Sequence, residues 1–316
     1  LRQSAIPATV AALLKTLHEA GFSAYPVGGC VRDLLLGRQL HDWDVTTNAL
    51  PRQSEELLQS CRVIETGVQH GTITVLAGDC PVELTTFRGE GGYADGRHPD
   101  TVTFGVTLQQ DLSRRDFTIG AMAWDTEKNC LIDPFGGQQD LQNRLIRAVG
   151  DPDRRFAEDG LRILRGLRFA AELGFAVEPE TAAALQRNAP RLQSLSPERV
   201  RTELQKLICG RAAAPVLREY IEVIGVVLPE LLPMVGFAQN NPHHNRDVWE
   251  HTLTVLENIP AEPVLRWAAL LHDAEKPACC IVDAEGIRHF HGHQQKSAET
   301  AEAMLRRLHC ETRLIA

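Results

Sequence analysis

The chain has 316 residues, of which 43% are hydrophobic, and its formal net charge is −8. That length is enough for two or three domains with a sizeable core. The N-terminus has no secretory apolar region, and no apolar run approaches membrane-spanning length, so no membrane partner is expected. The charge excludes a globally basic nucleic-acid coat but not a local basic stripe, which is what a nucleic-acid binder needs.

The eight cysteines are scattered and form no C-x-x-C pair. They indicate reduced thiols and a cytoplasmic protein rather than a disulfide framework or a zinc site. The chain begins with Leu1 and stops at Ala316 directly after a helical pattern. We therefore expect it to be a piece of a longer protein.

The first half of the chain mixes helical and strand patterns. The expected elements, in chain order, are a helix over 8–20, a strand over 24–27, a helix over 31–36, a strand over 42–46 and a meander at 62–65, 72–76 and 82–87. Residues 88–100 hold four glycines and no apolar periodicity, which predicts a long mobile loop.

Strand signals fade from about residue 151 onward. Helical patterns cover 153–173, 180–194, 197–209, 212–227, 246–258, 263–272 and 295–309. The pattern predicts an N-terminal α/β or α+β head followed by an all-helical remainder.

Asp42 and Asp44 are the most informative pair in the chain. Side chains two residues apart in a strand leave the same face, so the two carboxylates project together while Trp43 and Val45 point into a core. Adjacent carboxylates repel each other unless a cation neutralises them, and Mg²⁺ takes one or two carboxylates plus phosphate oxygens. Alone, such a pair also fits two surface aspartates near a strand end.

Gly28-Gly29-x-x-Arg32-Asp33 precedes this pair by about ten residues. Glycines at a strand-to-helix turn let backbone N–H groups approach a phosphate closely. Arg32, in the first turn of the helix, can fork onto phosphate oxygens. Together with the aspartate pair, the turn indicates a nucleotide site.

Arg114-Arg115-Asp116 is a second charged cluster between strand-like and helix-like segments. One interpretation is a helix start with Asp116 as its cap. The other places Arg115 on a triphosphate and Asp116 near the metal. The residues alone leave both open.

A helix is predicted over 154–173, and beside its leucine stripe lie a carboxylate and three arginines: Asp159, Arg162, Arg165 and Arg168. Steps of three drift about 60° around a helix, so the first three share a broad face and the last has rotated roughly half a turn. One interpretation is a solvated face laced with ion pairs. Three arginines without a lysine favour planar, bidentate recognition.

Seven of the twelve histidines fall in residues 243–293, including His251 and His272, which Asp273 follows. Histidine and aspartate clustered on neighbouring helices are typical of a metal site. Each histidine alone is equally consistent with a structural role.

Six motifs line up in order and spacing with one family. They are Gly28-Gly29-x-x-Arg32-Asp33, Asp42-x-Asp44-x-x-Thr47, Gly67-x-x-His70-Gly71-Thr72, Glu83-x-Thr85-Thr86-Phe87-Arg88, Arg114-Arg115-Asp116-Phe117-Thr118 and Glu158-Asp159-x-x-Arg162. Over roughly residues 20–210 the chain resembles the bacterial class II tRNA nucleotidyltransferases, which are the CCA-adding enzymes and their A-adding relatives.

The resemblance implies an α+β fold. A polymerase-β-like nucleotidyltransferase head with a small mixed sheet would occupy 1–150. A helical neck with the nucleotide-selecting helix would occupy 151–215, and a helical body with an HD-like segment 216–316. Residues 89–99 resemble the flexible loop that such enzymes use when adding A.

The resemblance also assigns roles to residues. Asp42 and Asp44 would be catalytic and hold Mg²⁺, with Asp116 in support. The nucleotide would be bound by Gly28, Gly29, Arg32, Arg115, Asp159, Arg162, Arg165 and Arg168.

The implied reaction is the transfer of CMP and AMP from CTP and ATP to the tRNA 3′ end, without a nucleic-acid template and without DNA as a partner. An A-adding enzyme that completes tRNA-CC and a poly(A) polymerase remain alternatives. A hypothesis of another class is an HD-type metal phosphohydrolase or an RNA-binding module.

Two positions depart from the family pattern. Glu275 stands in the HD-like segment where a small residue or glycine is usual, so we expect His251, His272 and Asp273 to be a structural remnant of a metal site. Gly120 stands where the family usually has Asn, so a contact made by that amide is missing.

Overall fold

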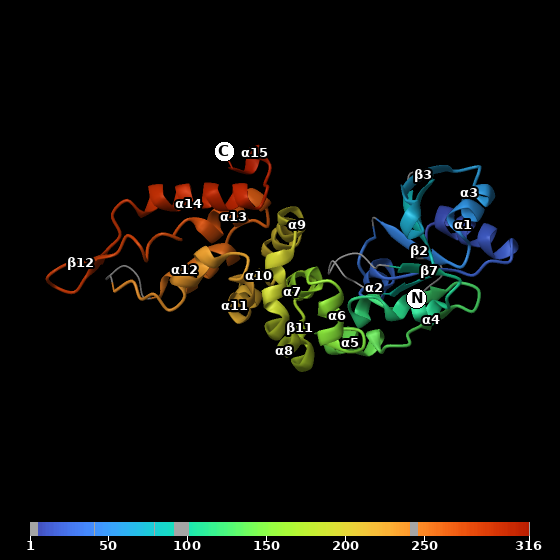
Figure 1. Ribbon diagram of the computed structural model, residues 1–316, viewed down its shortest axis with the longest axis horizontal. Coiled ribbons are helices and arrows are strands. Elements are labelled where there is room, and N and C mark those ends of the chain that lie inside the picture. The colour runs from blue at the N-terminus through green and yellow to red at the C-terminus, as the bar shows by residue number, and fades with distance from the viewer. Residues whose placement is uncertain (1–5, 41, 79, 92–100, 241–245, 316) are drawn as a thin grey trace. The chain divides into compact units, whose positions relative to one another are not determined.

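The computed structural model describes residues 6–40, 42–78, 80–91, 101–240 and 246–315. The chain forms two compact units, Leu1–Asp159 and Gly160–Ala316. In Figure 1 the first unit contains the sheet, and the second is almost entirely helical. The predicted α+β class is confirmed. The boundary expected at residue 215, between a neck and a body, stays a prediction.

A five-stranded sheet forms the centre of the first unit, in the order β1-β2-β5-β4-β3. Its strands are β1 (Ala24–Pro26), β2 (Trp43–Thr47), β3 (Arg62–Gly67), β4 (Thr72–Ala77) and β5 (Cys80–Thr86). Strand β2 runs parallel to β5, and the other neighbouring pairs are antiparallel. The predicted small mixed sheet and its meander are therefore confirmed.

The two faces of this sheet differ in polarity. Trp43 and Val45 of β2 are buried at 2% and 1% exposure, as the alternation predicts. Helix α1 (Ala8–Glu19) contacts β1, β4 and β5 through its buried leucines and valine. On the alternate positions of β2 and β5, Asp44 stands in register with Glu83. Acidic side chains thus gather on the face opposite the apolar core.

Short elements complete the first unit around this sheet. The helices are α2 (Gly29–Leu35), α3 (Pro51–Leu57), α4 (Leu108–Ser113), α5 (Gly137–Asn143) and α6 (Pro152–Glu158), with 3₁₀ turns at Val68–His70 and Thr118–Gly120. The remaining strands are β6 (Arg88–Gly91), β7 (Thr101–Phe104), β8 (Ala123–Asp125), β9 (Cys130–Ile132) and β10 (Leu145–Ile146).

The loop predicted over 88–100 begins instead as a strand, because β6 pairs with β7 in an antiparallel hairpin. The glycines that suggested a loop face threonines across this hairpin. A Cβ at Gly91 would lie 3.0 Å from Oγ1 of Thr101, and one at Gly89 3.2 Å from Oγ1 of Thr103. A larger residue at either position would require the facing threonine to shift by a few tenths of an ångström. The rest of the predicted loop, 92–100, lies outside the described residues.

The second unit confirms the predicted helical remainder. Its helices are α7 (Leu161–Leu173), α8 (Pro179–Asn188), α9 (Pro197–Ile208), α10 (Ala213–Glu219), α11 (Ile221–Ile224), α12 (Val248–Glu257), α13 (Pro263–Leu271), α14 (His293–Arg307) and α15 (Thr312–Ile315), with 3₁₀ turns at Ala189–Ser194 and Pro229–Met234. Short strands also occur: β11 (Ala176–Val177) and a hairpin of β12 (Ile281–Val282) with β13 (Arg288–His289).

The single helix expected over 154–173 is wrong. Helix α6 ends at Glu158, Asp159 is extended with φ −148° and ψ 109°, and α7 begins at Leu161. Gly160 between them lies against another segment, since a Cβ there would stand 3.2 Å from Cβ of Arg191. Asp159 therefore does not share a helical face with Arg162 and Arg165.

Candidate functional site

The aspartate pair lies at the start of β2 on the acidic face of the sheet. Asp42 is exposed one residue before the strand, and Asp44 is half-buried within it. The pKa of Asp44 is raised to about 6, chiefly by burial and also by the neighbouring Glu83 and Asp42, while Arg115 and Arg32 act in the opposite direction. The carboxylates thus lack full compensation by the protein's own cations, which favours a bound cation.

The predicted glycine turn lies directly beside Asp44. Gly28 has φ +75° and ψ −128°, a conformation that only glycine adopts readily, and its N–H donates to the carbonyl of Met122. A Cβ at Gly28 would stand 2.9 Å from Nη1 of Arg115 and 3.8 Å from Oδ2 of Asp44. Three residues predicted separately therefore meet at one point.

Arg115 is held loosely at this point. Its Nη1 donates to the carbonyl of Gly120 and its Nη2 to Oδ2 of Asp111, both at 3.5 Å. Its buried Nε has no hydrogen-bond partner among the described residues. Since a guanidinium carries five N–H donors, Arg115 keeps capacity for an anion.

The other predicted phosphate and support residues surround the same turn. Arg32 forms a two-pronged ion pair with Asp33, at 3.0 and 2.7 Å, and still affects the pKa of Asp44. Asp116 accepts the N–H of Phe117 and is not the cap of an α-helix, because a 3₁₀ turn follows. At Gly120, where the family usually has Asn, a Cβ would lie 3.8 Å from Oδ1 of Asp116.

Sequence reasoning missed two carboxylates of this site. Glu83 stands beside Asp44 only because β5 pairs with β2, and the chain separates the two residues by 39 positions. Asp111 precedes Arg114 and Arg115 by three and four residues, a helical spacing that could have revealed the pairing.

The arginines of α7 are all half-buried. Arg168 pairs with Glu203 at 2.6 Å and with Glu172 at 3.1 Å, and its guanidinium lies 4.1 Å from the ring centre of Phe169. Arg165 lies 5.7 Å from the same ring. Arg168 is therefore part of a buried ion pair rather than a solvated surface charge, and its role toward the nucleotide stays a prediction.

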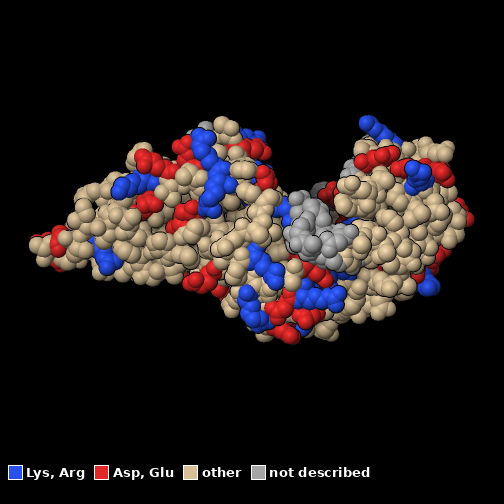
Figure 2. Space-filling model, in the orientation of Figure 1, with Lys and Arg blue, Asp and Glu red and all other residues tan. Residues whose placement is uncertain are grey.

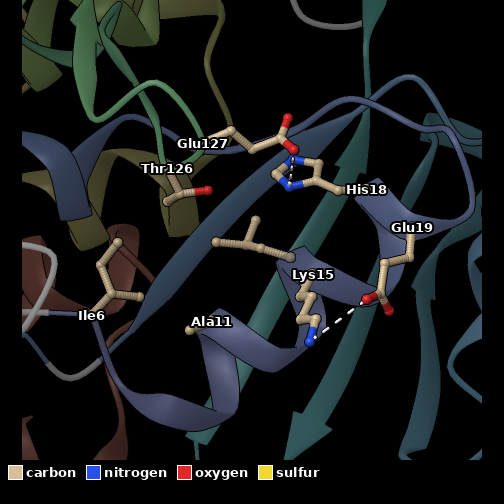
Figure 3. A pocket seen from close by; sticks show the side chains of 8 residues that line it. Ile6, Ala11, Lys15, His18, Glu19, Thr126 and Glu127 are labelled. Carbon is tan, nitrogen blue, oxygen red and sulfur yellow. Dashed lines mark ion pairs between the residues drawn. The ribbon is translucent and has the colours of Figure 1, made fainter.

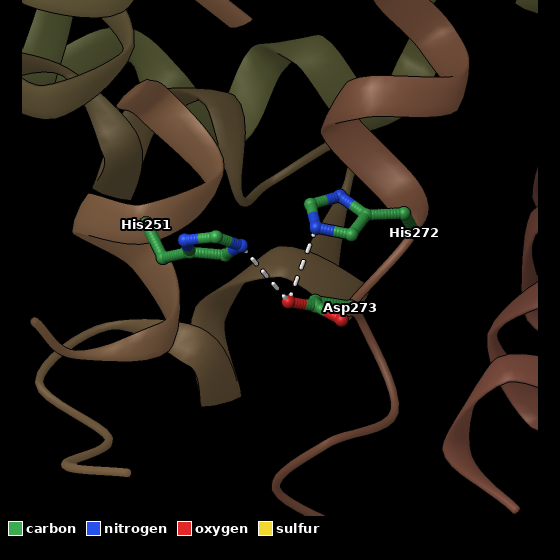
Figure 4. A group of neighbouring side chains, drawn as sticks. All are labelled: His251, His272 and Asp273. Carbon is green, nitrogen blue, oxygen red and sulfur yellow. Dashed lines mark ion pairs between the residues drawn. The ribbon is translucent and has the colours of Figure 1, made fainter. Parts of the chain in front are cut away.

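A cluster of histidines surrounds Asp273 in the second unit (Figure 4). His251 of α12 lies 3.6 Å and His272, directly after α13, lies 3.1 Å from Oδ2 of Asp273. One donor atom from each of the three residues lies within 4.8 Å of the others. The structure thus brings together the three residues predicted for an HD-like site.

Two further residues complete this cluster, and sequence reasoning did not assign them. His293 lies 3.4 Å from Oδ1 of Asp273, and the buried Lys276 lies 2.8 Å from its Oδ2. Hydrogen bonds and charges from His272 and Lys276 hold the pKa of the buried Asp273 well below its usual range. The carboxylate therefore stays ionised, whether the cation beside it is Lys276 or a metal.

A separate cavity of about 640 Å³ lies in the first unit, between α1 and the turn that follows β8 (Figure 3). Lys15 pairs with Glu19 at 3.6 Å, and His18 with Glu127 at 3.9 Å. None of the predicted site residues lines it.

Comparison with known proteins shows the family of the chain. The family model described as "Poly A polymerase head domain" matches residues 24–147, and "Probable RNA and SrmB- binding site of polymerase A" matches 174–233. The crystal structure of the Bacillus stearothermophilus CCA-adding enzyme in complex with CTP aligns with a TM-score of 0.63 and 30% identity, over 95% of this chain and 83% of that one. The chain belongs to the CCA-adding enzyme family.

Two other similarities support the assignment. The CCA-adding enzyme of Lactobacillus helveticus (strain DPC 4571) is 42% identical over 262 residues, which is 81% of this chain and 65% of the relative. A tRNA nucleotidyltransferase complexed with a primer tRNA and an incoming ATP analog aligns with a TM-score of 0.58 and 26% identity, over 77% of this chain and 74% of that one. The chain thus spans less than two thirds of its curated relative. Among the described residues, no helix is long and apolar enough to cross a membrane.

Proposed function

We propose that this chain transfers CMP and AMP from CTP and ATP to the tRNA 3′ end without a nucleic-acid template. The observation that carries the proposal is the meeting of Asp44, Arg115 and Gly28 at one turn, beside Asp42 and Glu83. The carboxylates fit the cation of a nucleoside triphosphate. The spare donors of the guanidinium fit its phosphates, and the glycine lets the phosphates approach the backbone closely. Membership of the CCA-adding family supports this choice of reaction.

In this reaction the tRNA 3′-hydroxyl attacks the α-phosphate, and pyrophosphate leaves. Arg115 and Arg32 would hold the triphosphate, and the backbone at Gly28 and Gly29 would let it approach. Asp116, next to Gly120, would keep this turn in place. Because the protein contributes orientation and charge rather than a covalent intermediate, its residues act by positioning.

Mg²⁺ is the cation we propose for Asp42 and Asp44. The donor set fits, because the oxygen ligands are hard and burial, with the nearby Glu83 and Asp42, raises the pKa of Asp44 to about 6. The chemistry that such an ion supplies is stabilisation of the charge on the attacking and leaving oxygens. Glu83, in register with Asp44, is a third carboxylate available to the same ion.

We propose that Asp159 and Arg162 select the base. A carboxylate accepts from the exocyclic amine of C or A, while a guanidinium donates to the adjacent ring nitrogen. U and G present a carbonyl where the amine would be, and it would face the carboxylate with no proton between them. A buried mismatch of this kind costs on the order of 1–3 kcal/mol. Arg165 would support this pair.

The tRNA would be recognised by its shape and phosphates, as is usual for structured RNA. Lys and Arg alternate with Asp and Glu on the face shown in Figure 2, and a short continuous run of basic side chains crosses the helical unit. A local basic stripe of this kind serves a phosphate backbone despite the net charge of −8. Since CTP, ATP and tRNA meet in the cytoplasm, we place the proposed activity there.

Incorporation of radiolabelled CTP or ATP tests the proposal on tRNAs that end before CCA, after C and after CC. Incorporation on all three indicates CCA addition. Incorporation of A on tRNA-CC alone indicates an A-adding enzyme, and long A tails on any RNA indicate a poly(A) polymerase. No incorporation on any substrate would refute nucleotide transfer by this chain.

A second candidate function is binding of a divalent cation by His251, His272 and Asp273. The favouring observation is that His293, missed in the sequence, adds a fourth donor around the buried carboxylate. The opposing one is Lys276, a resident cation 2.8 Å from the same aspartate. The fourth donor, His293, makes an HD-type phosphohydrolase a candidate. The resident cation, Lys276, favours a structural remnant of a metal site.

Measuring bound metal distinguishes a working HD-type site from a structural remnant. The Asp42→Ala/Asp44→Ala variant removes the first site, and Mn²⁺ binding is then measured with and without His272→Ala. One bound ion that His272→Ala abolishes, together with loss of metal-dependent phosphatase activity, supports a working HD site. No bound ion in either protein supports an ion-pair network around Lys276.

A further inference from the structure

Asp111 of α4 is a fully buried carboxylate at 0% exposure, and no step of the proposed reaction uses it. It accepts from four groups: Nε and Nη2 of Arg114 at 3.0 and 2.8 Å, the N–H of Arg88 at 3.2 Å, Oγ1 of Thr46 at 3.4 Å and Nη2 of Arg115 at 3.5 Å. A buried charge is costly unless it is paired and hydrogen-bonded, so these partners keep the carboxylate ionised in place.

The two arginines use this carboxylate differently. Arg114 directs two donors at Oδ1 in short bonds, and its side chain is 16% exposed. Arg115 reaches Oδ2 with one nitrogen in a long bond. Its other contact is the carbonyl of Gly120, and its Nε has no hydrogen-bond partner among the described residues. Asp111 therefore contacts one edge of the Arg115 guanidinium, and Nη1 on the other edge lies toward Gly28.

The same carboxylate is tied to the strand that carries the reacting centre. Thr46, which contacts Oδ2 of Asp111, follows Asp44 by two residues in β2 and so lies on the same face of the sheet. Arg88, whose N–H reaches Oδ1, begins β6. Asp111 thus contacts both Arg115 and the strand that carries Asp44.

We propose that Asp111 is a positioning residue that holds Arg115 in register with Asp44 to receive the triphosphate. The inference rests on the proposed function, since it assigns Arg115 to the triphosphate. It predicts that Asp111 acts on nucleotide binding through Arg115 alone. If Asp111 had only a structural role, Asp111→Asn would instead reduce folding stability equally in the wild-type and the Arg115→Met backgrounds.

A double-mutant cycle between Asp111→Asn and Arg115→Met tests this. We expect Asp111→Asn to raise KM for CTP about tenfold in the wild-type background, which is the usual scale for one charge-assisted contact. In the Arg115→Met background it should change KM by less than about twofold. An equal rise in both backgrounds would overturn the proposal. A lower kcat at unchanged KM would overturn it too, because that result reports less folded enzyme or a contact made only in the transition state, and not weaker nucleotide binding.

Asp140 provides a matched control. It is also a buried carboxylate of the first unit, at 4% exposure, and it pairs with Thr118 at 2.6 Å and Arg147 at 3.2 Å. Asp140→Asn should lower the melting temperature as Asp111→Asn does, without raising KM for CTP. A rise in KM equal to that of Asp111→Asn would mean that any buried carboxylate of this unit gives the effect, against the proposal.

Two further measurements keep the test decisive. If Asp111→Asn does not fold, Thr46→Val removes the hydroxyl that contacts Oδ2 of Asp111 and the carbonyl of Thr85, and leaves the carboxylate in place. It should raise KM by about two- to threefold, and only where Arg115 is present. An unchanged KM would then count against the proposal. Wild-type protein that neither binds nor uses CTP refutes the proposed function itself. Normal wild-type kinetics with an additive cycle refute only the role of Asp111.

Discussion

Gly28 and Arg115 lie so close that a Cβ at position 28 would stand 2.9 Å from Nη1 of the arginine. The same Cβ would lie 3.8 Å from Oδ2 of Asp44. The absence of a side chain at Gly28 thus lets the guanidinium and the carboxylate face one small space. This relationship, rather than any single motif, defines the site.

Gly28→Ala should therefore raise KM for CTP by more than about tenfold, because the methyl group displaces Arg115 and the positive φ strains the backbone by roughly 1–2 kcal/mol. Gly37→Ala is the matched control, since Gly37 has φ +68° with nothing within 4 Å of its Cβ position. Steady-state kinetics and thermal unfolding of both variants separate strain from displacement. A KM change of equal size in both would contradict the assigned role of Gly28.

The pH dependence of the free energy of unfolding should reveal the raised pKa of Asp44. Its pKa in the folded protein is about 6, raised above 3.8 by burial, so the ionised group opposes folding above pH 6. The penalty fades as the pH falls through 6 and is gone below 3.8. In EDTA, Asp44→Asn should stabilise the protein at pH 8 by on the order of 1–3 kcal/mol, and not at pH 3.5.

Thermal unfolding between pH 3.5 and 8 gives the measurement. Asp42→Asn is the control, because its exposed carboxylate should give a smaller change. A gain for Asp44→Asn that stays constant with pH would refute the assigned cause.

Arg168 should matter for stability within the helical unit, whatever part it takes in nucleotide binding. Arg168→Met leaves Glu203, 6% exposed, without its cation, and we expect a loss of about 3 kcal/mol. Adding Glu203→Gln should restore part of the loss. Arg306→Met breaks an exposed pair with Glu302 and should cost less than about 1 kcal/mol. Equal losses for the two arginines, by urea unfolding, would argue against the buried pair.

Asp159→Ala tests base selection. Loss of the carboxylate that opposes a carbonyl on U or G should reduce discrimination by roughly 10- to 100-fold, from the 1–3 kcal/mol of a buried mismatch. KM for CTP should change much less, because the triphosphate is held elsewhere. Competition among the four nucleotides on one tRNA measures both. Unchanged selection among the four nucleotides would contradict the role assigned to Asp159.

The sequence pattern predicted the parts of the fold that depend on local periodicity. The strand of Asp44 alternates as expected, and Gly28 stands at the expected turn, because both signals lie within a few residues. Glu83 and His293 could not be placed, since each meets its carboxylate only through the folding of distant segments. The break at Asp159 was not predicted, because the apolar pattern continues on both sides of it. Gly89 and Gly91 led to the wrong prediction because glycine occurs in loops and also where two strands lie close together, as in this hairpin.

The most direct test of the central claim compares wild-type protein with Asp44→Ala on a tRNA that ends before CCA, with CTP, ATP and Mg²⁺ supplied. Sequencing of the product ends gives the result. The assigned chemistry predicts that wild-type protein adds CCA and stops, while Asp44→Ala binds the tRNA but adds nothing. Addition at an undiminished rate by Asp44→Ala would contradict the placement of nucleotide transfer at this turn.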